Sequence, residues 1–121
     1  MTVPLKFKLY PTVEELVIPE RKSEGAAGYD VYSPQAFEIQ PRTSVRVSLG
    51  FRIDLPDGVL INLYMRSGLA LKKGLNVVGR RIYGSKEEVF VEIRNYSEET
   101  YRASRGDRIV QMVFHEALML K

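Results

Sequence analysis

The sequence of 121 residues contains no cysteine and a single histidine, His115. Without cysteine there is no disulfide and no thiol chemistry, and the common zinc sites built from cysteine and histidine are excluded. One histidine gives poor support to a serine or cysteine hydrolase triad, which needs a histidine base. The absence of cysteine is compatible with a cytoplasmic or nuclear setting, which we expect for this chain.

The sequence also lacks a long apolar run and a strong charge imbalance. No run reaches the roughly 18 apolar residues of a transmembrane helix, so no contact with a membrane is expected. Residues 1–10 alternate in polarity, unlike the apolar core of a secretion signal. Lys and Arg number 18 against 15 Asp and Glu, a formal net charge of +3. This mild excess favours an anionic ligand but is too small to argue for nucleic acid.

What is present is a typical soluble composition. The apolar content of 45% and the charged content of 27% are those of a globular protein. The length fits one domain over residues 1–121 and is sufficient to bury a core without metal or disulfide.

The dominant hydrophobic period is two residues, which is typical of half-buried strands. Turn residues interrupt it at Pro41, at Pro56-Asp57-Gly58 and at Gly74, where a short helical turn over 69–74 is predicted to end. Gly50 is a candidate bulge. Residues 11–18 fit either one helical turn or a loop, and residues 95–108 are polar and rich in turn formers. Strands are predicted near residues 5–10, 29–32, 36–39, 43–54, 59–65, 75–82, 88–94 and 109–114.

Short strands separated by frequent turns predict an all-β sandwich or barrel. Three segments in it resemble the motifs of the trimeric dUTPase family: Ala26–Tyr32 (AAGYDVY), Arg66–Ala70 (RSGLA) followed by Lys72 and Gly74, and Gly106–Gln111 (GDRIVQ). Their order and spacing also match. The resemblance implies a dUTPase-like distorted jelly-roll or β-barrel, with the chain as one subunit of a homotrimer.

The resemblance also implies a triphosphate site between subunits. Arg66 offers a planar fork of donors, Ser67 offers a hydroxyl and an N–H, and Gly68 lets the backbone approach a ligand closely. In the family, the residues that match Ser67, Gly68 and Gln111 contact phosphates. The residue that matches Asp30 helps to hold the Mg²⁺–triphosphate arrangement through water, so Mg²⁺ is expected if a nucleotide is bound. Taken singly, these residues also fit surface, turn and strand positions that contact no ligand.

The resemblance fails at the family's third motif, Gly-x-x-Asp-x-x-Tyr-x-Gly, whose Asp orients and deprotonates the attacking water. Here the nucleotide-pocket hairpin begins at Gly79, and two ways of counting place Ile82 or Tyr83 at the Asp position and Ser85 or Lys86 at the Tyr position. No aspartate occurs between Asp57 and Asp107. A positioned general base raises the rate of such a reaction roughly 10²–10⁴-fold. The family's Gly-rich fifth motif is also missing from the sequence given.

Glu87 and Glu88 are the only substitutes for the missing base that we consider, and they require the shortened hairpin to turn one of them inward. Otherwise they are an exposed pair at the start of a strand. The replacements also add Arg80, Arg81 and Lys86 near Lys72 and Lys73. This basic cluster either binds an anion or an acidic partner surface or is a solvated hairpin.

Three functions remain open. The first is a catalytically inactive dUTPase relative reused to bind a protein or a nucleotide, a use known among viral members of the family. The second is an active Mg²⁺-dependent pyrophosphatase that converts dUTP, or another nucleoside triphosphate, to the monophosphate and diphosphate. The third and weakest is nucleic-acid binding through the basic hairpin. The apolar segments 109–114 and 117–120 pack either at a subunit contact or in the core.

Overall fold

The computed structural model describes residues 7–21 and 28–116. Ala26, Ala27, Leu5 and the apolar segment 117–120, on which parts of the sequence predictions fall, lie outside the described residues. The chain forms strands and one short helix in this order: β1 (Lys8–Pro11), β2 (Glu20–Arg21), β3 (Gly28–Tyr32), β4 (Phe37–Ile39), β5 (Ser44–Asp54), β6 (Val59–Met65), α1 (Ser67–Lys73), β7 (Leu75–Val78), β8 (Ile82–Tyr83), β9 (Glu88–Asn95), β10 (Tyr101–Ala103) and β11 (Arg108–Glu116). The all-β prediction is confirmed.

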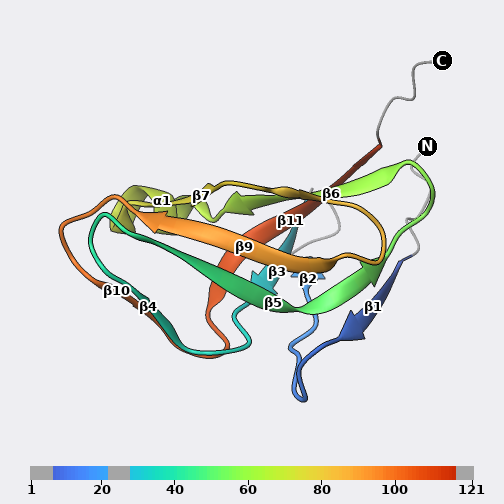
Figure 1. Cartoon of the computed structure of the whole chain (residues 1–121), viewed down its shortest axis with the longest axis horizontal. Coiled ribbons are helices and arrows are strands. Elements are labelled where there is room, and N and C mark those ends of the chain that lie inside the picture. The colour runs from blue at the N-terminus through green and yellow to red at the C-terminus, as the bar shows by residue number, and fades with distance from the viewer. Residues whose placement is uncertain (1–6, 22–27, 117–121) are drawn as a thin grey trace.

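Two antiparallel sheets carry most of the fold. One has the strand order β1-β5-β9-β7 and the other β2-β3-β11-β6-β8, and β10 pairs with β4 in a small third sheet. Figure 1 shows the long strands β5 and β9 running side by side, with α1 at one end of the molecule and β1 at the other. No helix among the described residues is long and apolar enough to cross a membrane.

The core lies between the two large sheets. Alternate residues of β9 are buried, namely Val89, Val91, Ile93 and Asn95, which is the period-two pattern read from the sequence. They join one hydrophobic cluster with inward-facing residues of the other sheet. Its largest fully buried members are Phe51, Ile39, Leu49, Ile53, Ile61, Leu63, Leu75, Ile93, Ile109 and Met112.

The predicted bulge at Gly50 is present. The pairing of β5 with β9 shifts register between Ser48 and Arg52, and Gly50 has φ 85°. A Cβ on Gly50 would lie 3.0 Å from Val13 Cγ2, so the position needs glycine for its backbone conformation and for its packing. The neighbouring segment 11–18 contains no helix, so the loop alternative for it is correct.

The segment predicted as one strand over 75–82 is divided in the structure. β7 pairs with β9 in the four-stranded sheet, whereas β8 pairs with β6 in the five-stranded sheet. The chain therefore crosses from one sheet to the other between Val78 and Ile82. Gly79, with φ 69°, is the first residue after β7. The polar segment 95–108 also contains a strand that the sequence pattern did not predict, β10.

Candidate functional site

The junction between β6 and α1 exposes the donors that the sequence pattern selected. β6 ends at Met65, whose partner across the sheet is Val110 of β11. Arg66 follows as the residue preceding α1, with φ −62° and ψ 136°, and no side chain caps the helix. The first N–H groups of a helix have no partner within it, so those of α1 are available to another group. Ser67 and Gly68 are exposed, and a Cβ at Gly68 would meet nothing within 4 Å.

Gln111 lies beside this junction on β11. Its neighbours along the strand, Val110 and Met112, are buried, whereas Gln111 itself is exposed. Its cross-strand partners are Tyr64 on β6 and Asp30 on β3. Since directly paired residues lie on the same face of a sheet, Gln111 shares its face with Asp30 and Tyr64. The amide of Gln111 is thus free to contact a ligand on that face.

Asp30 is a predicted site residue that lies buried beside an arginine. It is 5% exposed, and one of its carboxylate oxygens lies 3.4 Å from Arg108 Nη1. The arginine offsets the cost of burying this carboxylate. Arg108 was not among the residues selected from the sequence, because its neighbours in the GDR motif read as a turn.

The hairpin that follows β7 holds the positions that replace the family's Asp and Tyr. Tyr83 is 5% exposed and belongs to the core, whereas Ile82 is 46% exposed and pairs with Asn62 of β6. Ser85 Oγ donates to Asp54 Oδ1 at 3.1 Å and accepts from Leu55 N at 2.9 Å. None of these three side chains supplies a carboxylate, and Ser85 is bound to the end of β5.

Lys86 also fixes the hairpin to the end of β5. Its N–H donates to the Ile53 carbonyl at 2.6 Å, and its φ is 66°. The left-handed backbone at this non-glycine residue turns the chain into β9.

Glu87 is held inside the hairpin by two hydrogen bonds. It accepts from Gly84 N at 2.6 Å and from Arg80 Nη2 at 2.6 Å. The bond from the Gly84 N–H, aided by the Arg80 guanidinium, lowers the pKa of Glu87 despite partial burial. A carboxylate whose pKa is lowered by hydrogen bonds to its charged form is a weak proton acceptor. The geometry therefore argues against Glu87 as a replacement base.

Glu88 faces the outside of the four-stranded sheet. It pairs across the sheet with Arg52, and one of its carboxylate oxygens lies 3.6 Å from Arg52 Nη2. Both glutamates line a cavity of about 390 Å³, together with Arg46, Arg80, Tyr83, Phe90 and Glu92. Neither Ser67 nor Gln111 lines that cavity, so within one chain the two glutamates do not face the exposed donors at the start of α1.

The basic cluster predicted from Lys72, Lys73, Arg80, Arg81 and Lys86 is divided between two places. The two lysines line a cavity of about 460 Å³ beside α1, and Arg80 lines the cavity on the outer face of the four-stranded sheet. Arg80 stacks over the Tyr83 ring at 4.7 Å, and Arg81 Nη2 donates to the Val77 carbonyl at 2.9 Å. Arg80 thus has its partners within the hairpin, and Arg81 has its partner on β7.

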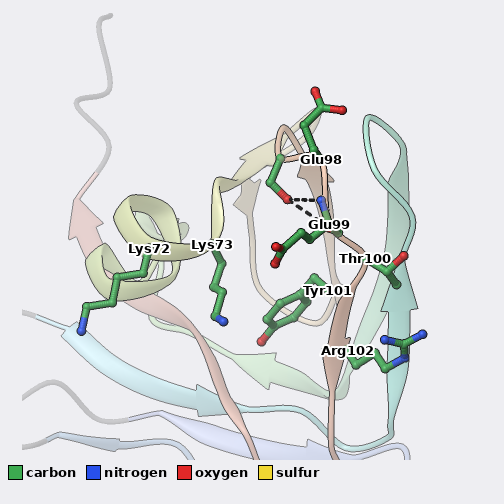
Figure 2. Close-up of a pocket in the computed structure, with 8 residues that line it drawn as sticks. Lys72, Lys73, Glu98, Glu99, Thr100, Tyr101 and Arg102 are labelled. Carbon is green, nitrogen blue, oxygen red and sulfur yellow. Dashed lines mark hydrogen bonds between the residues drawn. The ribbon is translucent and has the colours of Figure 1, made fainter.

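The cavity beside α1 was not predicted from the sequence. It lies between the helix and the segment from Ser97 to Arg102, and Figure 2 shows the side chains that line it. Tyr101 in its wall has a raised pKa because of burial and the nearby Asp107 carboxylate, and Arg66 acts in the opposite direction. Arg66 therefore lies within electrostatic reach of the Tyr101 hydroxyl. The sequence signal for this cavity was weak, since the segment reads only as polar loop.

The fold defines the chain as an all-β sandwich protein. Hydrogen-bond donors gather at the junction of β6 and α1 and on the adjacent strand β11, namely those of Arg66, Ser67, Gly68 and Gln111. The dUTPase family model matches residues 14–121. The chain belongs to the dUTPase family.

Curated relatives agree with this assignment. The deoxyuridine 5'-triphosphate nucleotidohydrolase of Zymomonas mobilis is 37% identical over 116 residues, which cover 93% of this chain and 80% of the relative. The enzyme of the same name from Clostridium novyi is 32% identical over 120 residues, covering 97% of this chain and 84% of the relative.

Solved structures of dUTPases share the fold. A mutant dUTPase from phage phi11 of S. aureus, described with a structural Mg(II) ion, superposes with a TM-score of 0.86 at 20% identity, covering 96% of this chain and 94% of the other. A mutant of the Staphylococcus bacteriophage 80alpha dUTPase with dUpNHpp gives a TM-score of 0.85 at 20% identity, covering 96% and 93%. The predicted dUTPase-like jelly-roll is thus confirmed.

Proposed function

We propose that this chain binds a nucleoside triphosphate, with dUTP as the first candidate, as one subunit of a homotrimer. Family membership supports the ligand class, and the donors of Arg66 and of the exposed residues Ser67, Gly68 and Gln111 support the place. These donors match the needs of a triphosphate, whose oxygens accept from cations, hydroxyls and backbone N–H groups. A site shared between subunits is consistent with the openness of this surface in the single chain.

Mg²⁺ is the cation that this proposal includes. Among the described residues no group of three His, Cys, Asp or Glu side chains could hold a metal by itself. Mg²⁺ in nucleotide sites is bound through one or two carboxylates, water and the phosphates, so a single carboxylate fits this mode. Asp30 lies on the same sheet face as Gln111 and would hold the ion indirectly, through water.

The hairpin leads us to infer that the bound nucleotide is retained rather than rapidly hydrolysed. The observation that carries this inference is the state of the two available carboxylates. Glu87 is bound to Arg80 and Gly84, and Glu88 lies against Arg52. Losing a positioned base lowers the rate by roughly 10²–10⁴. A protein of this kind would act through binding, with the nucleotide or a partner protein as its ligand.

The second candidate is an active Mg²⁺-dependent pyrophosphatase that produces dUMP and diphosphate from dUTP. The comparisons favour this candidate over the first, because the curated relatives are named as nucleotidohydrolases. It requires a base, and in a homotrimer Glu87 or Glu88 of a neighbouring subunit would have to leave its present partners to act as that base.

Two measurements on the purified chain separate these candidates. Calorimetry with the slowly hydrolysed analogue dUpNHpp and Mg²⁺ measures binding, and diphosphate release from dUTP and from a panel of other nucleoside triphosphates measures turnover. We expect binding that Ser67→Ala weakens, with turnover at least 10²-fold below that of an active dUTPase run in parallel. Turnover comparable to that enzyme, lost in Glu87→Gln or Glu88→Gln, would establish the second candidate instead.

Nucleic-acid binding is tested separately by its dependence on salt. Contacts to phosphates release counterions, so such binding weakens steeply as the salt concentration rises. We expect no binding of single- or double-stranded DNA at physiological salt, since Arg80 is bound to Glu87 and Arg81 to the Val77 carbonyl. Salt-sensitive binding that Arg80→Gln and Arg81→Gln weaken together would refute this expectation.

A further inference from the structure

The cavity between α1 and β10 has walls that are fixed before any ligand arrives. Asn95 is fully buried, and its amide donates to the carbonyls of Ile39 and Glu99 at 2.9 and 2.7 Å. Its oxygen accepts from the N–H and the hydroxyl of Ser97 at 2.9 and 2.7 Å. The loop that begins at Asn95 is therefore held from within, and a preorganised loop loses little entropy when a ligand binds.

The opposite wall is equally fixed. Gly74 ends α1 with φ 66°, and its carbonyl accepts from Tyr96 N at 2.8 Å. A Cβ at Gly74 would lie 3.3 Å from the Ser97 side chain, so the helix end and the loop are in close contact. The cavity between them has a volume of about 460 Å³, which is ample for a small anion.

The charges on the rim of the cavity are already paired with residues outside it. Arg102 Nε lies 3.0 Å from Glu38, and Glu98 is paired with Arg42. Lys72 also lines the cavity, but its side chain extends past the other side of α1 (Figure 2). The hydroxyls of Ser97 and Thr100 donate to Asn95 and Gln40, so three of the lining residues remain.

Those three are Lys73, Glu99 and Tyr101, whose polar ends point into the space between α1 and β10 (Figure 2). Neither Lys73 nor Glu99 forms an ion pair within the part of the chain that the structure describes. A tyrosine hydroxyl is protonated near neutral pH, and burial raises the pKa of Tyr101 further. The cavity thus offers an ammonium and a hydroxyl as donors and one carboxylate as an acceptor.

We propose that this cavity is a binding site for inorganic phosphate, with Lys73 and Tyr101 donating hydrogen bonds to its oxygens and Glu99 accepting a hydrogen bond from its P–OH group. Both forms of inorganic phosphate near neutral pH carry at least one P–OH group, which donates a charge-assisted hydrogen bond to a carboxylate. Sulfate has the same shape but no proton, so Glu99 repels it.

The donor set also separates free phosphate from a phosphoryl group on a larger ligand. A phosphate monoester has a second pKa of about 6 and is mostly without a P–OH group at pH 7. Glu99 therefore favours free phosphate over a monoester. This inference does not depend on the proposed nucleotide site, whose donors Ser67, Gly68 and Gln111 do not line the cavity.

The test is equilibrium dialysis of the full chain with radiolabelled phosphate at pH 7, in competition with sulfate and with methyl phosphate. We expect phosphate to bind at least about tenfold more tightly than either competitor, a difference that one charge-assisted hydrogen bond can supply. Glu99→Gln should bring sulfate binding to the level of phosphate, since the amide repels neither ion. Equal binding of the three anions by the unmodified chain overturns the proposal, as does a phosphate preference that survives Glu99→Gln.

The remaining variants locate the bound phosphate. Lys73→Met should weaken phosphate binding about tenfold, whereas Lys8→Met, an exposed lysine on β1, should leave it unchanged. Ser67→Ala should retain phosphate binding while it loses dUpNHpp binding. If Ser67→Ala abolishes phosphate binding and Lys73→Met does not, phosphate occupies the nucleotide site and the cavity is not its site. Because Lys73 and Glu99 are both exposed, their variants keep the core intact.

Discussion

Replacing Asn95 with alanine should destabilise the protein more than any other single polar substitution proposed for it. Asn95 is fully buried at the end of β9 and makes four hydrogen bonds with Ile39, Ser97 and Glu99. Alanine would leave the Ile39 carbonyl without a partner in the core, which costs about 1–3 kcal/mol. The Glu99 carbonyl and the N–H and hydroxyl of Ser97 regain partners from water, so the loss of each of these hydrogen bonds costs only a few tenths of a kcal/mol. The expected total loss of stability is therefore about 3 kcal/mol.

Urea denaturation at a fixed protein concentration measures this loss, since association of subunits would otherwise change the apparent stability. For a chain of this length, a loss of about 3 kcal/mol lowers the melting temperature by roughly 10 °C. The matched control is Asn76→Ala, because Asn76 is exposed on β7 and accepts only from Val77 N at 2.9 Å. That variant should stay within about 0.5 kcal/mol of the parent. A loss below about 1 kcal/mol for Asn95→Ala would refute the reasoning.

Three further predictions follow from backbone conformation and from the two shifted pKa values. Gly50→Ala should destabilise by about 2 kcal/mol more than Gly58→Ala in thermal melts, because both positions have positive φ but only Gly50 meets a neighbour at 3.0 Å. Equal losses would show that packing plays no part. Glu87→Gln should be less stable than the parent at pH 7, and the difference should vanish as the pH falls through the lowered pKa of the Glu87 carboxyl, since protonation removes the same stabilisation. A difference that persists at pH 2 in denaturation curves would contradict this cause. Tyr101→Phe should remove the tyrosine with the raised pKa from a spectrophotometric titration and leave the others unchanged.

Local patterns predicted the strands well where one face of a strand is buried. The alternation over 59–65 gave the bounds of β6, and Gly74 ends α1 as its freedom for positive φ predicts. The break between β7 and β8 falls at Gly79-Arg80-Arg81, but no local pattern shows that the two halves pair with different sheets. Strand β10 was missed because Tyr101–Ala103 is too short to show a period.

The candidate site was predictable only in part. Ser67, Gly68 and Gln111 were selected by their motifs and are exposed, but the partners of Asp30 and Glu87 depend on contacts across the fold. Arg108 reaches Asp30 across 78 positions of sequence, a distance that no local pattern covers. The cavity beside α1 depends in the same way on the contact of Gly74 with Ser97, which only the folded chain brings together.

The crossing of the chain between the two sheets limits how an aspartate could be introduced into this hairpin. At Tyr83 the carboxylate would enter the core, where an unpaired charge is costly. At Ile82 it would lie on the outer sheet face opposite Asn62, in a position fixed by strand pairing. Because Ser85 and Lys86 tie the following residues to the end of β5, neither single replacement can move the new carboxylate along the hairpin. Engineering water-activating chemistry into this protein therefore calls for an inserted residue that changes the register, with the point substitution made afterwards.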